Sequence, residues 1–179
     1  NFISSKIIKP TLDALRTKNS KFVGVLYCGL ILTDKGIFVI EFNCRLGDPE
    51  TQVLLPTINF DLIELIESCV DTNNKNIFKP TINKKAVGVV LASEGYPNKY
   101  ETNKELSINY SFNNNDSYIF HAGTKKNGKN LVTSGGRVLT VVGTGNSINE
   151  ARNLAYNICE KVNFDNKYFR KDIAKNIQE

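Results

Sequence analysis

The sequence predicts an α+β protein in which antiparallel sheets pack against helices. Residues 22–32 form an apolar run, a turn signal follows at 33–36, and residues 37–43 are largely apolar, a pattern typical of an antiparallel hairpin. Beyond residue 84, short apolar runs alternate with glycine-containing turns and predict a small strand-rich domain. A helical pattern follows these strands and predicts one helix packed on them.

Several local signals define elements in the first half of the chain. Pro10 suits the first turn of a helix, and the run 22–32 reads as a buried strand. Asp48 and Pro49 predict a helix start, with Asp48 as the N-cap and the proline at the first helical position. Another helix is expected after Asp61, because a glutamate three residues later completes a capping-box pattern.

The second half begins after a polar stretch. Residues 71–83 contain a proline and many asparagines and lysines, so we expect a linker there. Ser147 and Glu150 have capping-box spacing and predict the start of the packed helix. The strands expected between the linker and this helix are 86–92, 118–122, 131–133 and 137–142.

Composition excludes several classes of protein. The chain is 41% hydrophobic and 23% charged, as in soluble globular proteins, and no stretch approaches the roughly 20 apolar residues of a membrane span. The net charge is +5, but the lysines are dispersed and no basic block interleaves with aromatic residues. We therefore expect neither a nucleic acid nor a membrane as a partner.

The four cysteines show no metal-binding or disulfide pattern. Cys28, Cys44, Cys69 and Cys159 are scattered without a C-x-x-C pair, which argues against a zinc site and favours a reducing compartment. Each is expected to be a small buried or half-buried residue.

Three polar side chains follow one another at two-residue spacing at the end of the predicted hairpin. Glu41, Asn43 and Arg45 then share one face, which Ile37 and Val39 extend as an apolar wall. Carboxylate and amide oxygens suit Mg²⁺, and a guanidinium matches phosphoryl or carboxyl oxygens. Glu41 and Asn43 are the metal candidates, and an exposed polar pair is the structural alternative.

Arg45 is the candidate catalytic residue. In phosphoryl transfer followed by amide formation, a guanidinium can hold an acyl phosphate or stabilise developing charge. A salt bridge from Arg45 to Asp48 or Glu50 is the alternative, and the two roles can coexist. His121 lacks an accompanying nucleophile motif and is expected to be a hydrogen-bonded structural residue. Arg137 follows a Ser-Gly-Gly turn without a P-loop pattern, and its role stays open.

Five segments together carry a resemblance to a known family. GVLYCGLIL, IEFNCRLGDPETQVLLP, LASEGYP, FHAGT and SGGRVL occur here in the order found in phosphoribosylamine–glycine ligases, also called glycinamide ribonucleotide synthetases. The E-x-N pattern alone is common to ATP-grasp enzymes, whereas the continuation R-x-G-D-P-E-T-Q is much more specific. The resemblance runs from about residue 11 to about residue 173.

The resemblance implies a fold and a division of the chain. Residues 1–70 would be the C-terminal part of an ATP-grasp domain, 71–83 a linker, and 84–179 the β-rich C-terminal domain of the family. The N-terminal half of the family would be missing, so we expect these residues alone to be inactive. Many ATP-grasp enzymes carry another metal-binding acid on the preceding strand, where this chain has only Gly29 nearby.

The resemblance also implies a reaction. An ATP-dependent, cytoplasmic ligase would join glycine to phosphoribosylamine in purine biosynthesis, with Mg²⁺ or Mn²⁺ at Glu41 and Asn43. Arg45, Asp48 and Glu50 would lie by the substrate, although helix capping is the stronger expectation for Asp48. The alternatives are another ATP-grasp carboxylase or ligase and a non-catalytic ATP-grasp module. Fusion to other purine-pathway domains is left open.

Overall fold

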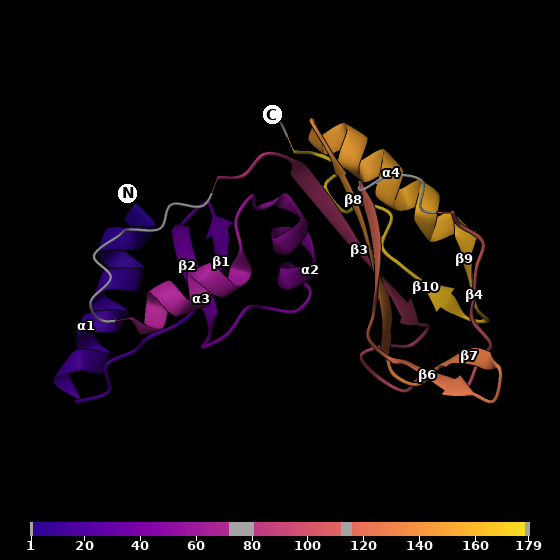
Figure 1. Ribbon diagram of the computed structural model, residues 1–179, viewed down its shortest axis with the longest axis horizontal. Helices are drawn as coiled ribbons and strands as arrows, with labels where there is room; N and C mark the ends of the chain where they lie inside the picture. The colour runs from indigo at the N-terminus through magenta and orange to yellow at the C-terminus, as the bar shows by residue number, and fades with distance from the viewer. Residues whose placement is uncertain (1, 72–80, 112–115, 178–179) are drawn as a thin grey trace. The chain divides into compact units, whose positions relative to one another are not determined.

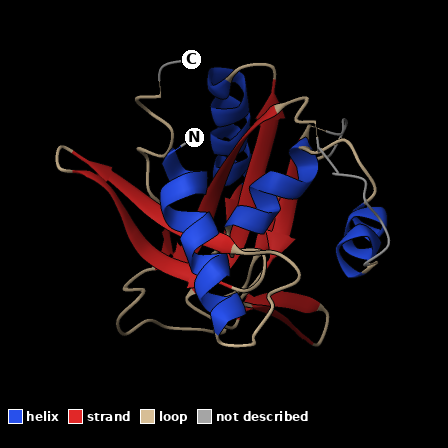
Figure 2. Ribbon diagram, turned by 90° about the vertical axis from the view of Figure 1, so that its left-hand side faces the viewer, coloured by secondary structure: helices blue, strands red, loops and turns tan. Residues whose placement is uncertain are grey.

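The computed structural model describes residues 2–71, 81–111 and 116–177. The chain forms two compact units, and each combines helices with antiparallel strands, which confirms the α+β prediction (Figure 2). Unit 1 comprises Asn1–Gly47 with Phe60–Pro80, and unit 2 comprises Asp48–Asn59 with Thr81–Glu179. Most of the expected linker lies outside the described residues. In the described ranges no helix is long and apolar enough to cross a membrane.

The described residues of unit 1 form two helical segments. A π-helical stretch, Ser4–Ile8, runs directly into α1, Lys9–Thr17, so the helix expected at Pro10 is present but its helical path begins earlier. The other helix is α3, Leu62–Val70, whose N-cap is Asp61 as expected. The Asp61 carboxylate accepts hydrogen bonds from the main-chain N–H groups of the second and third helical residues at 2.7 and 3.3 Å.

The hairpin of unit 1 consists of β1, Tyr27–Thr33, and β2, Gly36–Asn43, paired antiparallel across a two-residue turn. The prediction of one buried strand over 22–32 is wrong in two respects. The strand begins only at Tyr27, and in β1 Leu32 keeps 78% of its surface exposed. The reason is that β1 and β2 pair only with each other in the described part of the chain, so no further strand covers them.

The first segment of unit 2 carries α2, Glu50–Leu54, and the 3₁₀ turn Leu55–Thr57. Asp48 is not the N-cap of α2, which corrects the expectation from the sequence. Pro49 is the N-cap residue, and no side chain caps the helix. The Asp48 carboxylate instead accepts hydrogen bonds from Gln52 and Arg137, which explains why it does not cap the helix.

The main sheet of unit 2 has the antiparallel order β10-β3-β8-β5 (Figure 1). The sequence predicted its two long central strands and one flanking strand, but not the two-residue edge strand. Two smaller strand pairs, β4 with β9 and β6 with β7, also lie among the described residues of unit 2. The strand bounds are β3 Lys85–Ser93, β4 Ser107–Ile108, β5 Ser117–His121, β6 Thr124–Asn127, β7 Asn130–Thr133, β8 Arg137–Gly145, β9 Val162–Asn163 and β10 Lys167–Tyr168.

Helix α4, Ile148–Lys161, packs along β3 and β8 and closes the core of unit 2 (Figure 1). Ser147 accepts a hydrogen bond from the Glu150 N–H at 3.1 Å, so the predicted cap is present. The Glu150 carboxylate in turn accepts a hydrogen bond from the N–H of Asn146 at 2.9 Å. Gly143 of β8 faces this helix so closely that an added Cβ would collide with the Ala151 carbonyl, hence the need for glycine there.

The cysteines are free and fall into two groups. Cys159 is fully buried on α4, and Cys28 is half-buried, as expected. Cys44 and Cys69 are exposed, which corrects the expectation for these two. Both lie in unit 1, where little apolar surface is covered. Burial raises the pKa of the Cys159 thiol to about 12, with a smaller opposing effect of Lys167.

Candidate functional site

Strand β2 brings the two metal candidates together. The amide of Asn43 donates a hydrogen bond to Glu41 Oε1 at 3.0 Å, so both side chains lie on one face as their spacing predicted. Glu41 is exposed and Asn43 is half-buried. An accessible carboxylate beside an amide offers oxygen ligands for a hard cation, with room for phosphate oxygens and water.

Gly29 determines the space around Glu41. It lies directly opposite Glu41 in the β1–β2 register, and an added Cβ would stand 3.0 Å from Glu41 Cγ. Gly29, which lies near where the family resemblance suggests another acid, therefore leaves room for the Glu41 side chain. Among the described residues, no group of three or more His, Cys, Asp or Glu side chains could hold a metal ion.

Arg45 follows β2 and is exposed. Its Nη1 donates to the Leu46 carbonyl at 2.8 Å, a local contact that uses one of the five N–H donors of the guanidinium. Arg45 belongs to unit 1, whereas Asp48 and Glu50 belong to unit 2. The contact between Arg45 and substrate, and its alternative salt bridge, both stay predictions.

Asp48 is held by two side chains of unit 2. Arg137, the first residue of β8, donates from Nη1 to the Asp48 carbonyl at 2.8 Å and from Nη2 to Asp48 Oδ2 at 3.1 Å. Gln52 donates to the other carboxylate oxygen at 2.9 Å. Gln52 Oε1 is buried and lacks a hydrogen-bond partner within the described ranges. The segment that begins with Asp48 is thus fixed by side chains on its own helix and on the main sheet.

Two cavities of unit 2 border this segment. One of about 310 Å³ has mainly apolar walls and includes Pro49, Arg137 and Tyr168 in its lining. The other, of about 270 Å³, is lined by Pro49 and Glu50 together with residues of β3 and of the C-terminal segment. Glu50, a predicted substrate residue, therefore borders a cavity rather than a flat surface.

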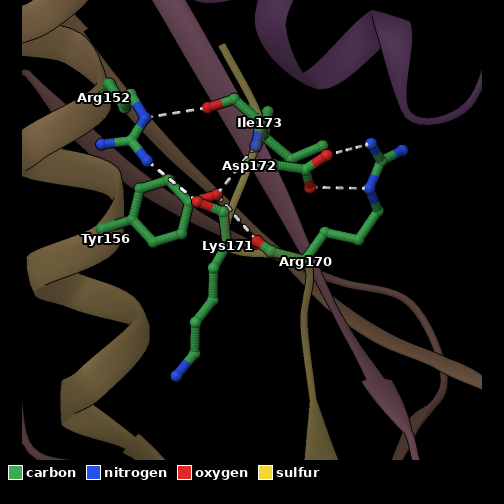
Figure 3. A network of polar contacts seen from close by, with 6 residues as sticks. All are labelled: Arg152, Tyr156, Arg170, Lys171, Asp172 and Ile173. Carbon is green, nitrogen blue, oxygen red and sulfur yellow. Dashed lines mark hydrogen bonds and ion pairs between the residues drawn. The ribbon is translucent and has the colours of Figure 1, made fainter. Parts of the chain in front are cut away.

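The C-terminal segment that lines these cavities is fastened to α4 (Figure 3). Tyr156 donates through its hydroxyl to the Arg170 carbonyl at 2.7 Å and accepts from the Ile173 N–H at 3.1 Å. Arg152 donates to the Ile173 carbonyl at 2.9 Å. Arg170 forms a two-pronged ion pair with Asp172, and this hydrogen bonding lowers the pKa of the carboxyl group.

His121 has a local hydrogen bond, as expected. Its Nδ1 lies 3.0 Å from the hydroxyl of Thr124, and the side chain is exposed at the end of β5. The roles of Arg137 and Gln52 were not predicted. For Arg137 the only sequence signal was that GDPETQ and SGGRVL occur together in family order, because its pairing with Asp48 spans 89 residues. Gln52 lies four residues after Asp48, a local spacing that could have indicated their contact.

Comparison with known proteins gives the family. Residues 86–176 match the model of the phosphoribosylglycinamide synthetase C domain, which covers half of the chain. The chain belongs to the phosphoribosylglycinamide synthetase family. Residues 1–51 match the ATP-grasp (A) domain of the same synthetase. The expected order, the end of an ATP-grasp domain followed by the C domain, is confirmed.

The relatives of this synthetase-family chain are longer proteins. It is 46% identical over 175 residues to the phosphoribosylamine–glycine ligase of Caldanaerobacter subterraneus, covering 97% of this chain and 41% of that ligase. It is 39% identical to the trifunctional purine biosynthetic protein adenosine-3 of Chironomus tentans, covering 98% of this chain and 13% of that protein.

A solved structure shows the same fold. The crystal structure of phosphoribosylamine–glycine ligase from Thermotoga maritima matches with a TM-score of 0.68 and 38% identity. The match covers 83% of this chain and 36% of that chain. The present synthetase-family chain thus spans well under half of the length of these relatives.

Proposed function

We propose that this chain is the C-terminal part of an ATP-dependent ligase that joins glycine to phosphoribosylamine, giving glycinamide ribonucleotide, ADP and phosphate. The observation that carries the proposal is the Glu41–Asn43 pair on β2, next to Arg45 and followed by the GDPETQ segment. The family and the names of its relatives support the same activity. The expected domain limits, 1–70 and 84–179, belong to the proposal.

Glu41 and Asn43 fit a divalent cation. Glu41 supplies an exposed carboxylate, and Asn43 an amide at hydrogen-bond distance from it. These hard oxygen ligands suit Mg²⁺ or Mn²⁺, which keep several positions for phosphate and water. When bound, such an ion neutralises phosphate charge and polarises the transferred phosphoryl group. With only two protein ligands, most of the coordination would come from ATP and water.

The other candidate residues, Arg45, Asp48 and Glu50, would bind and orient the substrates. Arg45 presents an exposed guanidinium, suited to hold the acyl phosphate formed on the glycine carboxylate and to stabilise its negative charge. Glu50 borders a cavity and is suited to attract an amine-bearing substrate. Asp48 is already bonded to Arg137 and Gln52, so its main role is to orient the segment. Positioning supplies much of the catalysis in such a reaction.

Other classes remain distinguishable by experiment. A carboxylase of the ATP-grasp type would consume bicarbonate, and a non-catalytic module would consume nothing. The relatives include multifunctional purine proteins, so the protein that carries this chain can have further purine-pathway domains. A cytoplasmic location is part of the proposal, supported by scattered free cysteines.

The test is ADP release by the complete polypeptide that carries this sequence. We expect release that requires glycine, phosphoribosylamine and Mg²⁺ together, and none from residues 1–179 alone. Release that requires bicarbonate instead of glycine would favour the carboxylase. No ATP consumption with any of these substrates would favour the non-catalytic module.

A further inference from the structure

The contact between Arg137 and Asp48 joins two sequence segments that are 89 residues apart. Arg137 is the first residue of β8, a central strand of the main sheet, and Asp48 stands two residues before α2. One guanidinium reaches both the main-chain carbonyl and the carboxylate of Asp48, at 2.8 and 3.1 Å. Two such contacts fix both the position and the orientation of the residue that they hold.

Stability is a poor explanation for this contact. The Arg137 and Asp48 side chains are 38% and 47% exposed, and ion pairs at such exposure contribute little to folding. Unit 2 contains another long-range pair, Lys84 with Asp116, at a similar exposure of 40% and 37%. That pair includes neither Asp48 nor a residue of α2, and it provides a comparison at matched exposure.

The structure offers a second support for the segment beyond Asp48. Gln52 of α2 holds the other oxygen of the Asp48 carboxylate at 2.9 Å, so the carboxylate links the sheet to the helix. Between these two contacts lies Glu50, in the first turn of α2, bordering a cavity of about 270 Å³. A shift at Asp48 would therefore move Glu50 relative to that cavity.

We propose that Arg137 is a positioning residue that holds Asp48 and thereby sets the place of Glu50 for the amine-bearing substrate. The inference rests on the proposed ligase function, but the placement of the segment can be tested apart from it. Arg137 itself needs no contact with substrate, since it acts through the segment it holds.

The first experiment measures steady-state kinetics of the complete ligase with Arg137→Gln and, as the matched control, Lys84→Gln. A misplaced binding group costs on the order of 10- to 10²-fold. We expect Arg137→Gln to raise KM for glycine or for phosphoribosylamine by that factor and to leave KM for ATP unchanged. Lys84→Gln should change none of the three. Equal effects of the two variants would overturn the proposal.

A conservative variant and a coupled variant sharpen the kinetic test. Arg137→Lys should restore the activity only in part, because one ammonium cannot reproduce the planar fork that reaches carbonyl and carboxylate together. Asp48→Asn combined with Arg137→Gln should cost no more than the larger single change, since both act through one contact. Multiplying effects of the two changes would overturn the proposal.

Hydrogen exchange tests the placement without any activity. In Arg137→Gln, the main-chain amide of Leu55, which donates to the Thr51 carbonyl at the end of α2, should exchange several-fold faster than in the unchanged protein, while Lys84→Gln should not change its exchange rate. Unchanged exchange in Arg137→Gln would overturn the proposal even in an active ligase. Faster exchange in a protein without ligase activity would sustain the placement while the proposed function fails.

Discussion

Unit 1 and unit 2 differ most in what they do with their apolar side chains. All of the buried hydrophobic residues of the described chain lie in unit 2, on β3, β8, α4 and the segments beside them. Unit 1 leaves Leu32, Ile40 and Ile63 at 78%, 66% and 66% exposed. The unit with the candidate metal residues has almost no core of its own, whereas the unit with the core supplies the fixed segment around Glu50. Within these 179 residues the core therefore lies in unit 2, while the apolar side chains of unit 1 stay largely uncovered.

Glu41→Ala in the complete polypeptide that carries this sequence should have the largest effect on the proposed activity. Loss of a metal ligand removes several kcal/mol of transition-state stabilisation, so kcat/KM should fall on the order of 10³-fold. The midpoint of thermal unfolding should stay the same, because the Glu41 side chain is exposed. Assays over a Mg²⁺ titration check this, with the exposed Glu67→Ala as control. Normal turnover of Glu41→Ala at every Mg²⁺ concentration would show that Glu41 is not a metal ligand.

Arg45→Lys should have the next largest effect. The lysine keeps the charge but loses the two-pronged geometry, and the expected fall in kcat is on the order of 10²-fold. Arg16→Lys, on exposed α1 in the same unit, serves as control and should have no effect. A near-normal rate for Arg45→Lys would show that only a positive charge is needed there.

Ile158→Ala and Ile66→Ala form a matched pair for stability, measured by denaturant unfolding of the 179-residue chain. Ile158 is 0% exposed, and its truncation should lower the free energy of unfolding of unit 2 by about 2–5 kcal/mol. Ile66 is 54% exposed, and its truncation should change the free energy of unfolding by less than about 0.5 kcal/mol. Similar decreases in the free energy of unfolding for both variants would contradict the difference in burial between the two units. A larger loss of stability for Ile66→Ala in the complete polypeptide would show that the Ile66 side chain is covered there.

The rates at which the cysteines are alkylated compare the exposure of the two units directly, although the expected effect on the protein is the smallest. Cys44 and Cys69 are exposed in unit 1, so both should be alkylated rapidly at pH 8 in the native chain. Cys159 should stay unmodified until unit 2 unfolds, because burial disfavours its thiolate. Mass spectrometry after timed alkylation distinguishes the three sites. Early modification of Cys159 would contradict the closed core.

The same thiol makes unit 2 sensitive to alkali. The pKa of Cys159 is about 12 in the folded chain, above its ordinary value of 9.0. Above pH 9 the unfolded chain loses this proton while the folded chain keeps it, so the contribution to stability falls progressively between about pH 9 and 12. Cys159→Ser should reduce that part of the pH dependence.

Local patterns in the sequence predicted most of unit 2 and the polar face of β2. Helix α4 was predictable from the helical spacing of its apolar residues and from its Ser147 cap. Strands β3 and β8 were predictable from their long apolar runs. Each of these signals involves residues close together in the sequence. The two-residue strands β9 and β10 escaped prediction, because pairing rather than composition creates them.

The errors in unit 1 and at Asp48 have a common cause. The burial of residues 22–32 depends on what covers the hairpin, and a local apolar pattern does not contain that information. Likewise, the local pattern made Asp48 an N-cap, whereas Arg137 of β8 engages its carboxylate. The exposure of residues 22–32 and the partners of Asp48 both depend on contacts between residues far apart in the sequence, which local spacing patterns do not reveal.

The anchoring of α2 by a residue of β8 has a consequence for the ribosome. Asp48 leaves the synthesis machinery 89 residues before its partner Arg137. At about 5–20 residues per second, that interval lasts roughly 5–20 s. During this time the nascent GDPETQ segment has neither the strand nor the sheet that later holds it. A helix of five residues is too short to persist alone, and α2 contacts both β3 and β8, so we expect it to become stable only after these strands have emerged.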